Sequence, residues 1–172
     1  MKMIKNNLLK NDTISNTQKH KNTLFWVLIV MVSFVLVHIF TLFYGITLVS
    51  GDSMNPTLHN NELHIYSTDL SNLKKGDIII FRNKYQTNED IYIKRVIAMP
   101  GDTIKCVGTK VYLNNELLNE NYIKQPVSEE FYCSYTIGND ELFVCGDNRN
   151  NSYDSRNFGP INTKDVIGII KK

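Results

Sequence analysis

The sequence predicts a mainly-β domain preceded by one N-terminal transmembrane helix. Three observations predict it: a long uncharged stretch near the N-terminus, short apolar runs bounded by turn residues after it, and no long helical periodicity elsewhere. The chain has 172 residues, of which 42% are hydrophobic. This length fits one modest globular domain and one additional element.

The uncharged stretch extends from Lys21 to Asp52, and residues 24–46 within it are almost wholly apolar. At about 1.5 Å per residue, a helix of this length spans a hydrocarbon core of about 30 Å. A cleaved signal peptide is the alternative. Its apolar run is usually only about 7–15 residues long, and no clear small-x-small cleavage site follows the stretch here. We therefore expect an uncleaved anchor.

Basic residues indicate the orientation of this anchor. Five lysines and one aspartate precede it, and such basic flanks stay on the cytoplasmic side. We expect a single-pass protein of the cell membrane with a cytoplasmic basic tail (1–22), a transmembrane anchor (23–46) and an extracytoplasmic β domain (47–172). The net charge of +2 is small and gives no argument for binding nucleic acid.

Short segments of the outer region have the composition of strands. Asn114 and Asn115 separate two of them and suit a two-residue hairpin turn. Residues 119–140 have a mixed composition, so we expect loops or irregular insertions there. The expected strands are residues 78–81, 91–99, 111–113, 116–118, 142–145 and 166–170.

Ser53 is the most informative residue, because it follows the anchor closely and is a candidate nucleophile beside a membrane surface. A serine hydroxyl is a poor nucleophile unless a base removes its proton, and histidine is the usual base. His20 falls on the cytoplasmic side, His38 falls in the anchor, and His59 and His64 lie in mixed polar surroundings. A Ser–His–Asp triad stays an alternative, although no recognisable motif supports it.

Lys94 is the preferred base. On a strand over residues 91–98 it shares a face with Tyr92, Val96 and Ala98, none of which is charged. Burial there would disfavour the ammonium and lower its pKa, so that the neutral amine could accept the Ser53 proton. The alternative is a lysine that reaches the surface or pairs with a carboxylate. From the strand alone, that alternative is favoured.

A dense polar loop over residues 146–156 is the third feature. Taken alone, it could be a solvated, turn-rich connection in which Asp154 and Arg156 form a surface pair of little energetic value. Each feature is weak by itself, but their order and their combination with an anchor are specific. Together they indicate a serine–lysine hydrolase anchored to a membrane.

Four stretches, in this order, resemble the type I signal peptidases of bacteria. They are Ser-Met-x-Pro-Thr at 53–57, the strand start Gly-Asp-Ile-Ile at 76–79, Lys-Arg-Val-Ile-x-x-Pro-Gly-Asp at 94–102, and Gly-Asp-Asn-Arg-x-Asn-Ser-x-Asp-Ser-Arg at 146–156. The resemblance covers residues 24–170. Lysine at position 94 is typical of the bacterial type, and the single anchor with a compact outer domain is similar to the Gram-positive form. The implied fold is a signal-peptidase-like β domain with an apolar face on the membrane.

The resemblance implies a membrane-anchored serine endopeptidase that removes signal peptides from exported preproteins. Ser53 would attack the peptide carbonyl and form an acyl-enzyme, and Lys94 would be the general base. Ser152 would hydrogen-bond and orient the lysine amine, and Met54 would help to form the floor of the substrate cleft. The residues that would hold or support the loop are Asp147, Arg149, Asp154 and Arg156.

The oxyanion site is incomplete in this comparison. Some relatives have a serine two positions before the nucleophile, whose hydroxyl helps to bind the oxyanion, whereas this chain has Gly51. The backbone N–H of Ser53 is then the clearest donor, and the second donor, for which the backbone of Gly51 is a provisional candidate, stays open, although one donor can contribute about 3 kcal/mol. The resemblance further implies cleavage after small residues of the Ala-x-Ala type, no metal or cofactor, contact with membrane lipid, no nucleic acid and a monomer.

Cysteine pairing and three rival functions also stay open at this point. Cys106, Cys133 and Cys145 permit one disulfide in an oxidising location. An inactive homologue that only binds exported chains is disfavoured by the intact Ser53, Lys94 and Ser152. A self-cleaving repressor would carry a DNA-binding domain, and a sortase-like transpeptidase centred on Cys145 would need a partnering histidine and arginine. Neither constellation is recognisable in the sequence.

Overall fold

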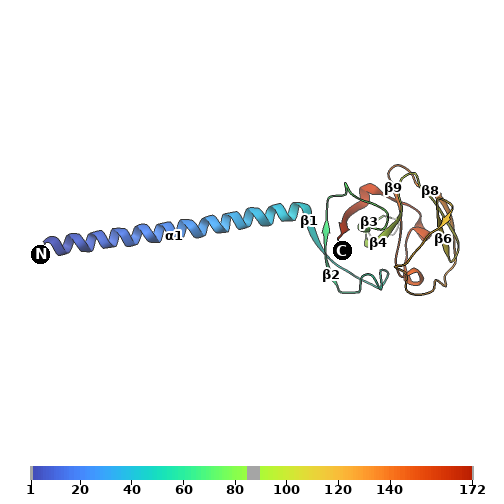
Figure 1. The fold of residues 1–172 in the computed structure, drawn as a ribbon, viewed down its shortest axis with the longest axis horizontal. Helices are drawn as coiled ribbons and strands as arrows, with labels where there is room; N and C mark the ends of the chain where they lie inside the picture. The colour runs from blue at the N-terminus through green and yellow to red at the C-terminus, as the bar shows by residue number, and fades with distance from the viewer. Residues whose placement is uncertain (1, 85–89, 172) are drawn as a thin grey trace. The chain divides into compact units, whose positions relative to one another are not determined.

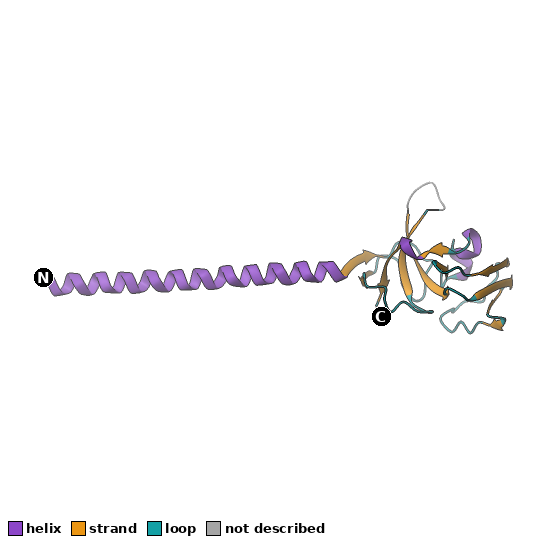
Figure 2. Cartoon of the chain, turned by 90° about the horizontal axis from the view of Figure 1, so that it is seen from above, coloured by secondary structure: helices purple, strands orange, loops and turns teal. Residues whose placement is uncertain are grey.

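The computed structural model describes residues 2–84 and 90–171, and the chain divides into two units, residues 1–42 and 43–172. The first unit lies within a single helix, α1 (Lys2–Phe43), and the second is built mainly from short antiparallel strands (Figures 1 and 2). The mainly-β fold class with one N-terminal apolar helix is therefore confirmed.

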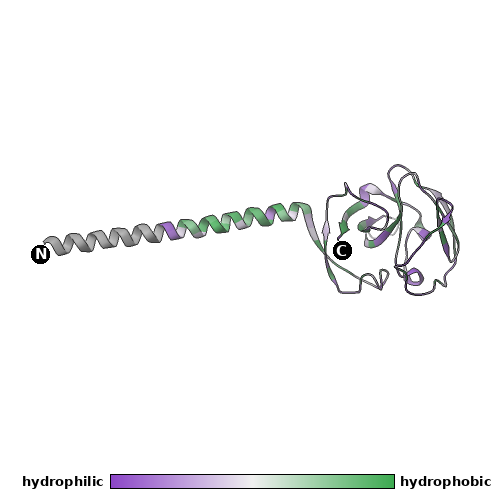
Figure 3. Ribbon diagram, viewed as in Figure 1, coloured by the Kyte–Doolittle hydropathy of each residue, from purple (hydrophilic) through white to green (hydrophobic). Residues whose placement is uncertain are grey.

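The apolar part of α1 is long enough to cross a membrane. It spans Lys21–Phe43, 23 residues, its side chains are exposed, and it forms the green part of the helix in Figure 3. A helix that is apolar all round suits lipid better than water. The helix ends at Phe43, and the chain continues directly into strand β1 (Tyr44–Leu48). The three residues 44–46, which we expected in the anchor, are strand because they pair with β2 (Leu63–Ser67).

Two antiparallel sheets make up the second unit. The larger has seven strands in the order β1-β2-β11-β3-β4-β9-β10, and the smaller has four in the order β7-β6-β5-β8. The further strands of the larger sheet are β3 (Ile78–Asn83), β4 (Asp90–Ala98), β9 (Glu141–Cys145), β10 (Ile161–Asn162) and β11 (Val166–Ile170). Those of the smaller sheet are β5 (Thr103–Gly108), β6 (Lys110–Leu113), β7 (Glu116–Leu117) and β8 (Phe131–Thr136). Short helical turns occur at Arg149–Asn151, Ser155–Phe158 (α2) and Thr163–Asp165.

A bulge in β4 divides its side chains between two cores. Val96 lies opposite Val144, but Ala98 lies opposite Phe143, so Ile97 is an extra residue on this strand. Val96 packs in the core of the larger sheet, whereas Ala98 packs in the core under the smaller sheet. The expectation that Ala98 shares the face of Lys94 is therefore wrong, because one extra residue interrupts the alternation of side chains.

The strands expected from composition are largely confirmed, with shifted ends. The hairpin turn is confirmed too: Asn114 and Asn115 have φ of 53° and 69°, which a type I′ turn requires at both central positions. The irregular segment expected at 119–140 is wrong in part, because it contains β8. The alternating polar and apolar residues of β8 are stabilised by pairing with β5, which lies far earlier in the chain.

The pairing of β5 with β8 also determines which cysteines form the disulfide. Cys106 and Cys133 lie directly opposite each other on β5 and β8, with Cα atoms 4.7 Å apart, and they form a disulfide. This spacing is normal for a disulfide. Cys145 is a free, buried thiol in β9, where it packs in the core under the smaller sheet.

Candidate active site

Ser53 lies on a closed loop between β1 and β2. The Val49 N–H donates to Glu62 O at 2.8 Å, and the Asn61 N–H donates to Val49 O at 2.9 Å, so the two ends of the loop are held together. Met54 follows Ser53 directly and is 1% exposed, packed in the core beneath the loop. The buried neighbour fixes the backbone of Ser53 while leaving its hydroxyl accessible from the cleft.

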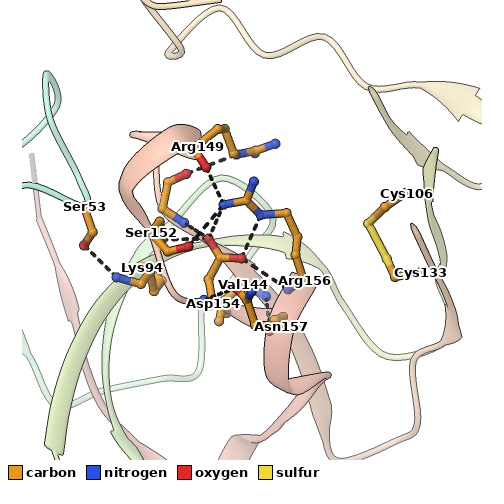
Figure 4. A network of polar contacts seen from close by, with 12 residues as sticks. Ser53, Lys94, Cys106, Cys133, Val144, Arg149, Ser152, Asp154, Arg156 and Asn157 are labelled. Carbon is orange, nitrogen blue, oxygen red and sulfur yellow. Dashed lines mark hydrogen bonds and ion pairs between the residues drawn. A yellow bond between two sulfur atoms is a disulfide. The ribbon is translucent and has the colours of Figure 1, made fainter. Parts of the chain in front are cut away.

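Lys94, on β4, contacts Ser53 on this loop. Its Nζ donates a hydrogen bond to Ser53 Oγ at 2.6 Å, although the two residues are 41 positions apart in the sequence (Figure 4). Lys94 is 4% exposed, and no carboxylate among the described residues forms an ion pair with it. The two alternatives weighed for this lysine, a surface position and a carboxylate partner, are both wrong.

Burial gives Lys94 an unusual titration. Desolvation lowers its pKa from 10.5 to about 8, and the nearby charge of Asp154 opposes this shift without cancelling it. Tyr92, two residues earlier on β4, has its ring centroid 5.3 Å from Nζ. A buried amine with this pKa is partly neutral at physiological pH and can accept a proton.

Asp154 is the centre of the polar loop. It is fully buried and accepts hydrogen bonds from the Gly146 N–H at 2.9 Å and from Ser152 Oγ at 2.7 Å. Arg156 donates to both of its carboxylate oxygens, from Nε and from Nη2, at 2.8 Å each. Although burial favours the neutral acid, these bonds and the charge of Arg156 outweigh it and lower the pKa of Asp154. The pair is buried, so the surface interpretation is wrong.

Ser152 differs from the expectation. Its hydroxyl donates to Asp154 rather than contacting Lys94 Nζ, whose described hydrogen-bond partner is Ser53 Oγ (Figure 4). A hydroxyl has one proton to donate, and the negative charge of the Asp154 carboxylate makes that carboxylate a strong acceptor for it. Ser152 nevertheless lies against the nucleophile loop: a Cβ on Gly146 would be 2.3 Å from Ser152 Oγ and 2.5 Å from Ser53 O.

Asp147 and Arg149 connect this loop to other elements. Asp147 accepts two bonds from Arg95, from Nε at 2.8 Å and from Nη2 at 2.5 Å. Arg149, 3% exposed, forms a two-bond ion pair with Glu120. The Tyr122 ring centroid lies 4.3 Å from the Arg95 guanidinium, and the Tyr122 hydroxyl donates to Glu120 Oε1 at 2.9 Å, so Tyr122 contacts both ion pairs.

Sequence reasoning missed Arg95, Glu120 and Tyr122. Arg95 follows Lys94 within a recognised motif, so its place could have been inferred from that motif. Glu120 and Tyr122 gave no signal, because they come from the segment that was expected to be irregular and their partners are distant in the sequence.

The backbone around Ser53 bears on the oxyanion site. The Gly51 N–H donates to Asn60 Oδ1 at 2.9 Å, so Gly51 does not offer this donor to a substrate, which corrects the provisional assignment. The Ser53 N–H has no hydrogen-bond partner among the described residues. It stays the candidate donor, and the structure identifies no second one.

A cleft of about 730 Å³ opens beside the Ser53–Lys94 contact. Its lining comes from residues 47–54, residues 90–94 and Asn151. Among the described residues, residues 90–94 of β4 pair with β3, whereas pairing with β9 begins at Arg95, and β1 pairs with β2. The cleft therefore lies between two edges that have no neighbouring strand in the described part of the chain, and no histidine lines it.

The histidines lie outside this cleft. His64 contacts Glu62 at 3.2 Å, and His59 is exposed, so the Ser–His–Asp alternative has no geometric support. Within residues 2–84 and 90–171, no group of three or more His, Cys, Asp or Glu side chains is arranged to hold a metal ion.

Comparison with known proteins agrees with this geometry. The family model of signal peptidase, peptidase S26, matches residues 21–171. The chain is 31% identical over 166 residues to signal peptidase I P of Bacillus subtilis subsp. natto, covering 88% of this chain and 89% of that protein. It is 34% identical over 171 residues to signal peptidase I of Bacillus licheniformis, covering 91% of each.

A solved structure matches as well. The crystal structure of a signal peptidase I from Enterococcus faecalis V583 superimposes with a TM-score of 0.50 and 27% identity, covering 60% of this chain and 100% of that chain. The family match extends over most of the chain, and the curated relatives are matched over nearly their full length. The chain belongs to the signal peptidase I family, peptidase S26, and is a serine endopeptidase that removes signal peptides.

Proposed function

We propose that Ser53 is the nucleophile and Lys94 the general base of this peptidase. The observation that carries the proposal is the 2.6 Å contact between Ser53 Oγ and the Nζ of a lysine that is 4% exposed. A serine needs an adjacent base, and a desolvated amine can serve as one near neutral pH.

The proposed reaction has two halves. In the first, neutral Lys94 accepts the Ser53 hydroxyl proton while Oγ attacks the scissile carbonyl carbon, and the Ser53 N–H donates to the oxyanion. The ammonium of Lys94 then returns its proton to the leaving amine, and the signal peptide stays bound to Oγ as an ester. In the second half, Lys94 takes a proton from water, which attacks the ester, and Ser53 Oγ leaves with that proton.

The surrounding residues hold this geometry. Asp154 and Arg156 keep the loop folded beside the dyad, and Ser152 acts through its bond to Asp154. Asp147 and Arg149 fix the same loop to Arg95 and to Glu120 through their ion pairs, and Met54 forms part of the cleft lining.

The two strand edges that flank the cleft support an extended substrate. A peptide between them can hydrogen-bond through its main chain, as in other cases of strand addition. Alternate side chains of an extended chain point to the same side, so the first and third residues before the bond face the same wall. We propose that both must be small, which corresponds to Ala-x-Ala sites in exported preproteins.

Membrane anchoring by Lys21–Phe43 is part of this proposal. The apolar, exposed helix supports one span, and the lysines before it favour a cytoplasmic N-terminus with the β domain outside. We propose that the enzyme acts as a monomer in contact with membrane lipid, where signal peptides are also held.

The test is cleavage of a purified preprotein with an Ala-x-Ala site by the full chain in detergent. We expect cleavage after the second alanine by the wild type and by Lys84→Ala, a control that removes an exposed lysine. Ser53→Ala and Lys94→Ala should both be inactive. Full activity in Lys94→Ala would refute the proposed base, and a folded wild type that binds the preprotein without cutting it would refute the enzyme assignment.

A further inference from the structure

The acidic side chains around the site fall into two groups. Three are neutralised by arginines in buried or half-buried ion pairs: Asp147 with Arg95, Asp154 with Arg156, and Glu120 with Arg149. Two others, Asp52 and Asp90, are exposed and line the cleft. Neither carboxylate has a hydrogen bond or an ion pair with any residue that the structure describes.

The cleft therefore presents negative charge to a peptide. Among its described lining residues the other charged side chain is Lys94, which is 4% exposed and already bonded to Ser53. Much of the remaining lining is apolar, including Leu48 and Ile91. Low-dielectric walls concentrate the field of charges in a cleft, so two carboxylates here act more strongly than on an open surface.

We propose that Asp52 and Asp90 determine substrate preference: they favour a basic residue near the scissile bond and disfavour an acidic one. This inference rests on the proposed function, because it requires the peptide to lie in this cleft beside Ser53. The inference goes beyond the small residues at the first and third positions before the bond, since it concerns the charge of substrate residues at other positions.

The positions of the two carboxylates indicate where each acts. Asp52 precedes Ser53 directly, so its charge acts within about two residues of the scissile bond. Asp90 lies four positions before Lys94 on β4. At about 3.3 Å per residue, the Asp90 carboxylate is therefore about 13 Å from Lys94 along the strand. Asp90 therefore acts on a substrate residue that is three to five positions from the bond.

The experiment uses the full chain in a zwitterionic detergent, which adds no net charge. Peptides with an Ala-x-Ala site carry one Lys, Gln or Glu at each flanking position in turn, and kcat/KM is measured for each. Without salt screening, unit charges about 8 Å apart in surroundings of effective dielectric constant near 40 predict a Lys-to-Glu preference of roughly 30-fold at the responsive positions. The preference should shrink strongly in 1 M salt, where the Debye length is only about 3 Å.

Variants assign the effect to the two residues. Asp52→Asn should remove the preference at positions adjacent to the bond, and Asp90→Asn at the more distant ones. Glu116→Gln removes an equal charge from β7, which does not line the cleft, and should leave both preferences unchanged. The Lys-to-Glu ratio is taken within each variant, so a general loss of folded enzyme cancels.

The outcomes separate this inference from the proposed function. Equal kcat/KM for Lys, Gln and Glu peptides in the wild type, or an unchanged preference in both Asn variants, would overturn the inference while leaving the peptidase intact. Failure of the wild type to cut even the Gln peptides would overturn the proposed function itself.

Discussion

Lys94 Nζ donates a hydrogen bond to Ser53 Oγ at 2.6 Å. No carboxylate among the described residues forms an ion pair with Lys94. Asp154 influences Lys94 only through its charge, because its own oxygens are taken by Arg156, Ser152 and the backbone. The lysine is thus buried with one neutral partner. Both its reactivity and its effect on stability depend on its protonation state.

The first prediction concerns the pH dependence of activity. The neutral amine is the active form, and the pKa of Lys94 is lowered to about 8, so kcat/KM should rise with pH and level off above a midpoint near 8. At pH 7 about one tenth of the enzyme would be in the active form. The measurement is the pH profile of peptide cleavage. A profile that is flat from pH 6 to 9 would rule out Lys94 as the titrating base.

The second prediction concerns the stability cost of the same burial. Because the folded pKa is below the unfolded value, the unfolded chain binds more protons between pH 8 and 10.5, and stability should rise with pH in this window. Below pH 8 the cost is fully present, on the order of 3 kcal/mol. Lys94→Met should therefore be inactive but more stable than the wild type at pH 7.

Urea unfolding at several pH values checks this. The advantage of Lys94→Met should diminish as the pH rises toward 10.5. Lys105→Met, at an exposed position on β5, is the control and should show no such dependence. A Lys94→Met protein less stable than the wild type at pH 7 would contradict the assigned desolvation.

The third prediction concerns the buried pair in the loop. Asp154→Asn leaves the Arg156 guanidinium, 2% exposed, without its counter-charge, so the free energy of unfolding should fall by about 3–5 kcal/mol. Asp165→Asn removes a carboxylate whose partner, Lys84, is 49% exposed, and should cost less than about 1 kcal/mol. Thermal unfolding of both variants measures the difference, and equal losses would mean that the Asp154 pair is solvated.

Short motifs made much of this site predictable. Ser53, Lys94 and residues 146–156 lie in stretches with recognisable order, and the structure brings all three together. The hairpin at Asn114 was predictable because its turn depends on local conformation. The strand pattern alone favours a surface or ion-paired lysine, so the burial of Lys94 was predictable only from the combination of motifs.

The remainder depends on contacts between distant segments. Glu120 pairs with Arg149 across 29 positions, and β8 exists because it pairs with β5; neither has a local pattern strong enough to predict it. The bond that Ser152 Oγ donates to Asp154 depends on how the folded loop places the two side chains. The motif contains both residues but does not encode this contact.

The last prediction concerns Gly146, where the two halves of the site touch. A Cβ at this position would be 2.5 Å from the backbone oxygen of Ser53 and 2.3 Å from Ser152 Oγ. Contacts below 3.0 Å cannot persist, and the Ser53 backbone is held by the Asn148 N–H at 3.0 Å. Gly146→Ala should therefore move the nucleophile loop away from Lys94 and lower kcat at least 100-fold, since small misplacements of reacting groups have effects of about this size.

Gly138→Ala is the matched control for this variant. Its Cβ would meet only the flexible side chain of Glu141, with the nearest oxygen at 3.1 Å, so activity should stay within about twofold of the wild type because that side chain can move aside. The expected result for Gly146→Ala is a lower kcat for peptide cleavage with a folded far-ultraviolet circular dichroism spectrum. Wild-type kcat in Gly146→Ala would mean that Ser53 and the 146–156 loop are not in contact, and the proposed role of Asp154 in holding that loop beside the dyad would fail with it.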